Sequence, residues 1–150
     1  MVFIAAAALS TLLSLGPPQP SGCAAARAYA AASTANDLIA LFHEDARYED
    51  VTFGFSVSGR SDIERMLKSA FAAVQPFTRR IERVICDDSG AAVEWTVTGN
   101  HAAPMLGVAP TGRSVTIRAV SLLRVESGRL QKVSDYTDRA TIESQLGIRR

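Results

Sequence analysis

The chain has 150 residues, of which 47% are hydrophobic and 21% are charged, and its formal net charge is +1. This length is typical of one domain with a single core. The nearly balanced charge gives no electrostatic attraction to nucleic acid or to an anionic membrane surface, so we expect neither as a partner.

The sequence contains only two histidines and two cysteines. The two histidines, His43 and His101, stand far apart without a paired ligand motif, and the sequence predicts no metal site. Cys23 and Cys86 permit at most one disulfide. Because Cys86 ends the apolar stretch 84–86, we interpret it as a small buried hydrophobic side chain.

The first 22 residues are predicted to be an extension that precedes a domain spanning residues 23–147. Residues 2–15 form an apolar run that is too short for a stable membrane span but has the length of a secretory signal core. No Lys or Arg precedes this run, and Pro20 stands where a lipoprotein signal carries a branched aliphatic residue. The alternatives stay open: an exported protein if residues 2–22 act as a signal peptide, or a cytoplasmic one in which they come from a wrongly assigned start codon or form a disordered extension.

The domain is predicted to begin with helices. Residues 23–33 are rich in Ala, the strongest helix former, and Asn36 is placed to cap a short second helix. Residues 46–51 then have the pattern of a short strand.

The clearest helix comes next. Ser61 and Glu64 have the spacing of a capping box, and Pro76 is expected to stop the helix. One face is apolar, so this helix should lie across a sheet. The apolar positions are Ile63, Met66, Leu67, Ala70, Phe71 and Val74.

Beyond this helix the hydrophobic period changes to two, which predicts strands. They form two hairpins, with turns at residues 87–90 and 127–128, joined by a loop over residues 103–112 that contains four Gly or Pro. Asp138 is expected to cap a last helix that ends at Gly147. The predicted strands cover residues 77–87, 91–102, 113–126 and 129–137.

Helices followed by a long antiparallel meander indicate an α+β fold with helices packed on one face of the sheet. Strands of ten or more residues bend strongly, and a bent sheet with a helix across its open side encloses a pocket. The strand over residues 91–102 places Val93, Trp95 and Val97 on one face, and the same period puts His101 on that apolar face. His101 therefore either faces the pocket or is held by a backbone carbonyl at the strand end.

Four segments in the second half resemble the SnoaL-like polyketide cyclases, within the nuclear transport factor 2-like superfamily. The resemblance covers residues 26–147 and is more specific for fold than for chemistry. It implies a cone-shaped, strongly curved antiparallel sheet with helices on its concave face and a carboxylate inside the pocket. The segments are Gly99-Asn100-His101, residues 105–113, Asp135-Tyr136-Thr137-Asp138 and Gln145-Leu146-Gly147.

The resemblance singles out Asp135. Periodicity alone does not decide its face, because Leu130 and Tyr136 compete for the interior. The family aligns Asp135 with the catalytic acid or base of SnoaL-like cyclases and of limonene epoxide hydrolase. A carboxyl group in an apolar cavity has a raised pKa and can transfer protons near neutral pH. The alternative is an aspartate bonded to backbone or to an arginine. For Asp138 an N-cap is the preferred interpretation, ahead of a chemical role.

A second constellation resembles the epoxide hydrolase in part. Tyr48 matches its tyrosine, whereas Asp50 replaces an amide that helps to hold water there. Both could reach the pocket, although Tyr48 packed over the core with Asp50 in solvent is the preferred interpretation. Epoxide hydrolysis by the known mechanism is disfavoured, because this chain has Trp95 and Val97 where that enzyme carries Arg-x-Asp. We expect the substrate-binding wall to include Tyr48, Asp50, Trp95, Val97, Ile117 and Ala119.

We hypothesise a cofactor-independent cyclase or isomerase that acts on a small hydrophobic carbonyl metabolite. Asp135 would remove a proton next to the carbonyl, and His101, together with Tyr48, would hydrogen-bond the enolate oxygen. The alternative is a non-catalytic domain that binds a ligand or dimerises. Under the family register the outer sheet face suits a homodimer contact through Thr116, Arg118, Val120 and Leu122.

Overall fold

The structure is a computed structural model that describes residues 22–148, so residues 2–21 of the proposed signal segment lie outside the described residues. The helices are α1 (Gly22–Ala31), α2 (Ala35–Ile39), α3 (Arg60–Ala73) and α4 (Arg139–Leu146). The strands are β1 (Phe42–Asp50), β2 (Phe55–Ser58), β3 (Val74–Cys86), β4 (Gly90–His101), β5 (Ser114–Glu126) and β6 (Arg129–Thr137).

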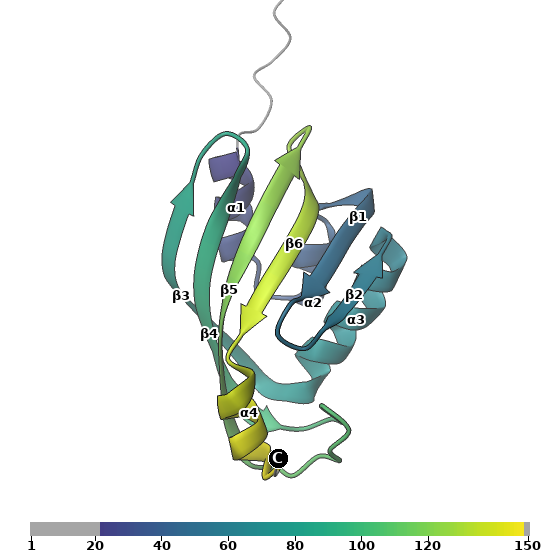
Figure 1. Cartoon of the computed structure of the whole chain (residues 1–150), viewed down its shortest axis with the longest axis vertical. Helices are drawn as coiled ribbons and strands as arrows, with labels where there is room; N and C mark the ends of the chain where they lie inside the picture. The colour runs from purple at the N-terminus through teal and green to yellow at the C-terminus, as the bar shows by residue number, and fades with distance from the viewer. Residues whose placement is uncertain (1–21, 149–150) are drawn as a thin grey trace, which may run out of the picture.

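The strands form one six-stranded sheet in the order β2-β1-β6-β5-β4-β3 (Figure 1). Neighbouring strands are antiparallel except for β1 and β6, which run parallel. This parallel pair joins the first strand of the chain to the last one. It aligns Asp50 with Asp135, which stand about 85 residues apart in the sequence.

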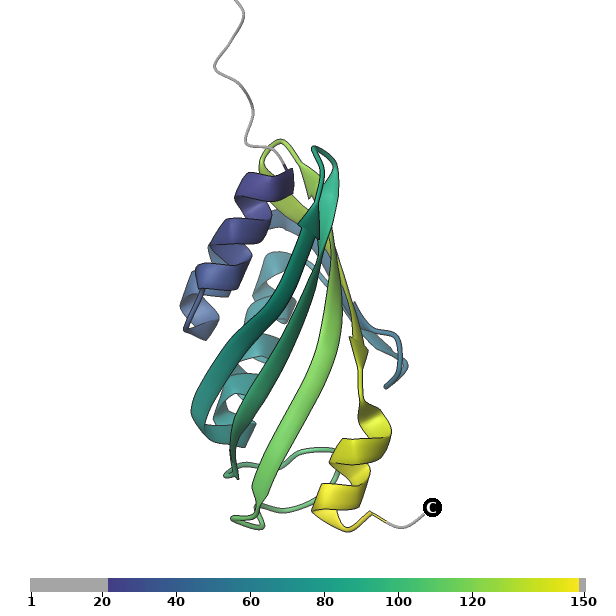
Figure 2. The same ribbon diagram turned by 90° about the vertical axis from the view of Figure 1, so that its left-hand side faces the viewer.

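Helices α1, α2 and α3 lie on one face of the curved sheet, whereas α4 lies at one end of the molecule (Figure 2). The predicted α+β fold with helices on the concave face is confirmed. Helix α1 buries residues at helical spacing, namely Gly22, Ala25, Ala26 and Tyr29. Among the described residues, no helix is long and apolar enough to cross a membrane.

Two predicted helix caps are wrong, and one is confirmed. Thr34, not Asn36, caps α2, because extended Thr34 and Asp37 exchange hydrogen bonds in a capping box. The proposed box at Ser61 does not form. The N-cap of α3 is Gly59, two residues before Ser61, and its positive φ of 84° turns the chain without a side-chain cap. Asp138 does cap α4, accepting a hydrogen bond from the Thr141 amide at 3.1 Å.

Strand boundaries differ most in the first half of the sheet. β1 is longer than predicted. β2 was not predicted, because it is only four residues long, is mostly exposed and shows no clear hydrophobic alternation. Helix α3 ends at Ala73, and Pro76 lies within β3 after a cis peptide bond. The loop between β4 and β5 and the end of α4 at Gly147 are confirmed.

Cys86 corrects a further expectation. It is exposed and forms a disulfide with Cys23, with a Cα–Cα distance of 5.1 Å. The apolar neighbours Val84 and Ile85 are themselves exposed, because β3 is an edge strand that helix α1 covers only in part. The disulfide attaches the start of α1 to the end of β3.

Candidate functional site

A cavity of about 390 Å³ lies between the inner face of the sheet and α1, α3 and α4. Its wall is mainly apolar, which suits a hydrophobic small molecule. Of the residues predicted to form the site, Ala119 is buried elsewhere and does not line this cavity. Those that do are Tyr48, Asp50, Trp95, Val97, Ile117 and Asp135.

Asp135 is buried, with 3% of its surface exposed. Its neighbours across the sheet are Ser121 on β5 and Asp50 on β1, so the central strands deliver polar groups to the carboxylate from both sides. Tyr136, the competing residue in the alternation of β6, is exposed instead. The pleat therefore directs Asp135 inward.

Two hydroxyl groups donate hydrogen bonds to the Asp135 carboxylate. The Tyr48 hydroxyl donates to Oδ2, and the Ser121 hydroxyl donates to Oδ1 at 2.6 Å. Each carboxylate oxygen has two lone-pair positions, so one on each oxygen stays available for a proton. The site therefore holds the carboxylate in place without saturating it.

Ser121 is itself held by two donors. Trp95 Nε1 donates to its oxygen at 2.8 Å, and Tyr29 Oη lies 2.9 Å from the same oxygen. Because the single hydroxyl proton of Ser121 points at Asp135, Tyr29 must be the donor in its contact. This network fixes the direction of the Ser121 hydroxyl and thereby the rotamer of the carboxylate.

Burial raises the pKa of Asp135 to about 6. The hydrogen bonds from Ser121 and Tyr48 oppose this shift, as does the positive charge of Arg79, whereas the nearby Asp50 carboxylate reinforces it. Burial also raises the pKa of Tyr48 well above its usual range, with the Asp135 charge as the next cause. At neutral pH the site therefore holds an ionised carboxylate beside protonated tyrosines.

Asp50 is buried rather than solvated, which corrects the preferred interpretation of its sequence. Its Oδ1 accepts hydrogen bonds from the Thr52 amide at 3.0 Å, the Thr52 hydroxyl at 2.7 Å and the Phe53 amide at 3.1 Å. Its Oδ2 accepts one from the Thr137 hydroxyl at 2.6 Å. Asp50 thus shapes the turn after β1 and supplies negative charge near Asp135.

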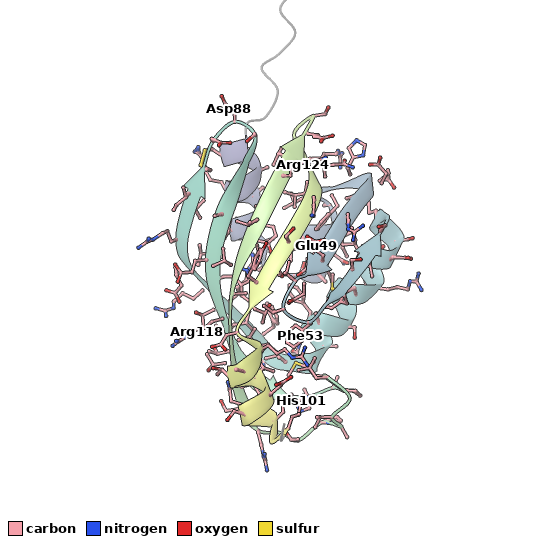
Figure 3. The ribbon with its side chains drawn as sticks, in the orientation of Figure 1. Glu49, Phe53, Asp88, His101, Arg118 and Arg124 are labelled. Atoms are coloured by element: carbon pink, nitrogen blue, oxygen red, sulfur yellow. A yellow bond between two sulfur atoms is a disulfide. The ribbon has the colours of Figure 1, made fainter. Side chains whose placement is uncertain are left out.

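His101 lies fully buried at the end of the molecule that carries α4 (Figure 3). The Thr111 amide donates to His101 Nδ1 at 3.3 Å, which leaves the ring proton on Nε2. That Nε2 atom has no hydrogen-bond partner among the described residues. His101 is not among the residues that line the cavity, so the structure does not bring it beside Asp135.

Three polar residues of the site were missed by the sequence analysis, namely Tyr29, Arg79 and Ser121. Arg79 extends from the inner face of β3 and lines the cavity. Tyr29 belongs to α1, and nothing in the Ala-rich pattern of that helix distinguishes its tyrosine from a core residue. Among the described residues, no cluster of His, Cys, Asp or Glu could hold a metal ion.

The outer face of the sheet carries the side chains that the family register placed there. Arg118 is exposed on this face (Figure 3). Leu122 and, on β6, Tyr136 are exposed as well. Glu94 lies on the same face, on β4.

Solved structures with the same fold include a candidate polyketide cyclase from Pseudomonas putida KT2440. It is 22% identical with a TM-score of 0.69, and the alignment covers 83% of this chain and 97% of that one. A protein from Catenulispora acidiphila DSM 44928 with a ketosteroid isomerase-like fold is 20% identical with a TM-score of 0.67, covering 83% and 93%. An LEH-like epoxide hydrolase from Mycobacterium tuberculosis is 21% identical with a TM-score of 0.61, covering 81% and 86%.

Among curated proteins there is no significant match. The sequence profile of one family does match, and it covers residues 24–146, which is nearly all of the described chain. The buried Asp135 in a cavity beneath a curved sheet agrees with the features that the sequence resemblance implied. This chain belongs to the family described as SnoaL-like polyketide cyclase.

Proposed function

We propose that the protein is a cyclase or isomerase that acts on a small hydrophobic carbonyl compound, with Asp135 as its acid and base. The observation that carries this proposal is a buried carboxylate in the wall of an apolar cavity, held by two hydroxyl donors. Its pKa of about 6 keeps it ionised at neutral pH while leaving it basic enough to accept a proton.

In the first step Asp135 removes a proton from the carbon next to the substrate carbonyl. The C–H electron pair forms a carbon–carbon double bond, and the carbonyl pair moves to oxygen, which gives an enolate. In a cyclisation the enolate carbon bonds to a second carbonyl carbon, and the new alkoxide takes the proton from Asp135. In an isomerisation the proton returns to another carbon of the conjugated system. Either route restores the carboxylate and needs no cofactor.

Tyr48 is the donor best placed to stabilise the enolate. Its pKa is raised, so the hydroxyl stays protonated, and it touches both Asp135 and the cavity. When Asp135 becomes neutral by taking the proton, the Tyr48 hydroxyl bonds more strongly to the enolate oxygen than to the carboxylic acid. His101, which does not line the cavity, has no part in this proposal.

Proton exchange on a simple ketone tests the proposal without knowledge of the natural substrate. The protein is incubated with 2-tetralone in heavy water, and deuterium uptake next to the carbonyl is followed by NMR. We expect exchange above the buffer rate, and a loss of about a hundredfold in Asp135→Asn, the scale of a lost general base. Asp88→Asn, an exposed aspartate in a turn, is the matched control and should exchange like the wild type. Equal rates in wild type and Asp135→Asn would refute the proposal.

Self-association through the outer sheet face is a second candidate function. Leu122 and Tyr136 are 44% and 46% exposed there. Glu94 and Arg118 have opposite charges there, and neither forms a salt bridge within the described part of the chain, although the Arg118 charge acts on Asp138. A two-fold axis would let Glu94 of each copy pair with Arg118 of the other. Light scattering should show a dimer that Leu122→Glu dissociates; a monomeric wild type at micromolar concentration would rule the dimer out.

We further propose export rather than a cytoplasmic location. Disulfides persist mainly in oxidising compartments, and the Cys23–Cys86 bond joins two elements of the domain. Fractionation of cells that express the full chain should place the protein outside the cytoplasm. Recovery in the cytoplasm with both thiols free would contradict this proposal.

A further inference from the structure

Arg79 is a cation in the wall of the cavity. It lies on β3 opposite Val97, with its side chain on the inner face of the sheet. Its guanidinium carbon is 5.2 Å from the centre of the Tyr29 ring. Among the described residues that line this cavity, Arg79 is the one that carries a positive charge.

One nitrogen of Arg79 has a structural task. Nη2 donates hydrogen bonds to the carbonyl oxygens of Tyr29 at 2.5 Å and Ala32 at 2.7 Å, and it lies 3.4 Å from that of Ala30. These carbonyls belong to the end of α1 and the residues just after it, where a helix lacks internal partners and favours positive charge.

The Nε and Nη1 atoms of Arg79 donate no hydrogen bond to the described residues. A guanidinium has five N–H donors, so Nε and Nη1 keep about three after Nη2 is accounted for. No described residue accepts a hydrogen bond from them, and no described carboxylate forms an ion pair with Arg79. These two nitrogens are also not buried in the core. Among the described side chains, the one polar atom that is buried without a hydrogen-bond partner is His101 Nε2.

We propose that Arg79 binds a carboxylate group of the ligand, so that the ligand is a hydrophobic carboxylic acid. Arg79 lines the cavity with donors that no described residue uses, and a ligand carboxylate supplies both an acceptor and an opposite charge. The inference rests on the proposed function in one respect: the carboxylate end would orient the ligand so that its reactive carbon faces Asp135.

Binding at Arg79 should also affect Asp135. Burial is the main cause of the raised Asp135 pKa, and the Arg79 charge opposes it. A bound carboxylate neutralises that charge and adds a negative one to the same cavity. The pKa of Asp135 then rises further, so an acid ligand takes up more protons on binding near pH 6 than a neutral ligand of the same shape.

A matched pair of ligands tests the proposal. Isothermal titration calorimetry compares 2-naphthylacetate with its uncharged amide, 2-naphthylacetamide, on the wild type. We expect the acid to bind about tenfold more tightly or better, the effect of one charge-assisted hydrogen bond. Arg79→Gln should abolish the preference, and Arg79→Lys should retain part of it. Arg80→Gln, the neighbouring arginine on the exposed face, is the control and should keep the full preference.

Amide binding shows whether the Arg79→Gln variant is folded, since that variant also loses the bonds to α1. The wild type gives a second measurement that needs no variant at Arg79: titrations at pH 6 in buffers of different ionisation enthalpy report proton uptake. Greater proton uptake with the acid than with the amide, lost in Asp135→Asn, supports the proposal. Equal affinity for acid and amide, equal uptake, or binding of neither ligand overturns it. None of these results depends on turnover, so a failed exchange assay leaves this test intact.

Discussion

Ser121 lies directly opposite Asp135 in the antiparallel pair of β5 and β6 and donates a hydrogen bond of 2.6 Å to its Oδ1 atom. The two residues are 14 positions apart in the sequence, on either side of a hairpin turn. Strand register alone thus brings a donor to the buried carboxylate. The hydroxyl stabilises the ionised form and keeps the pKa of Asp135 lower than burial by itself would.

Removal of that donor should raise the Asp135 pKa. In Ser121→Ala the carboxylate loses a hydrogen bond while its burial persists, so the ionised form becomes less stable. NMR titration of the side-chain carboxyl should give about 6 for the wild type and a higher value for the variant. Ser134→Ala, which removes a hydroxyl bonded to Glu49 at 2.8 Å, is the control and should leave the value unchanged. An unshifted pKa in Ser121→Ala would show that the bond is weak in solution.

The raised pKa also predicts how stability depends on pH. The folded chain binds the Asp135 proton more tightly than the unfolded chain, whose ordinary value is 3.8. The contribution of the Asp135 proton to folding stability is therefore fully present below about pH 4 and is lost as the pH rises through about 6. The loss is about 3 kcal/mol of unfolding free energy, at about 1.36 kcal/mol per pKa unit.

Urea denaturation from pH 4 to 7 measures this effect. Other carboxyl groups titrate in the same range, so the useful quantity is the difference between wild type and Asp135→Asn. Wild type should lose stability relative to the variant as the pH rises through the window of about 4 to 6. A constant difference would mean that Asp135 is not desolvated.

Tyr48→Phe should impair exchange while preserving the cavity. The variant loses the hydroxyl proposed to stabilise the enolate, which lowers the exchange rate on 2-tetralone by about a hundredfold. It also loses a donor to Asp135, so the pH at which activity rises should shift upward. Tyr136→Phe, on the exposed face of β6, is the matched control. If Tyr48→Phe keeps the wild-type rate, another group stabilises the enolate.

Loss of the disulfide should destabilise the domain. The bond between Cys23 and Cys86 closes a loop with a sequence separation of 63 residues. Release of such a loop costs about 4 kcal/mol of unfolding free energy, because the unfolded chain gains conformational freedom. Urea denaturation of Cys23→Ser/Cys86→Ser should show this loss, and dithiothreitol should produce it in the wild type only. Equal stability of wild type and double variant would show that α1 docks without the bond.

The sequence by itself determined the helices, the two long hairpins and the cap at Asp138, because periodicity and turn chemistry are local properties. It placed Trp95 and Val97 on the inner face of β4 for the same reason. The family resemblance, rather than the alternation of β6, selected Asp135. Shorter or less regular features were not predicted. β2 lacks a clear hydrophobic alternation, and Gly59 starts α3 through its backbone angle rather than through a side chain.

Only the tertiary structure decided the partners of Asp135. Counting back from the turn, where Glu126 pairs with Arg129, an uninterrupted register would set Val120 opposite Asp135. A shift in register between Arg124 and Val125 places Ser121 there instead. The parallel contact of β1 with β6 places Tyr48 beside Asp135. The packing of α1 places Tyr29 beside Ser121 and the end of that helix against Arg79. These contacts join residues up to 92 positions apart, and no local pattern records them.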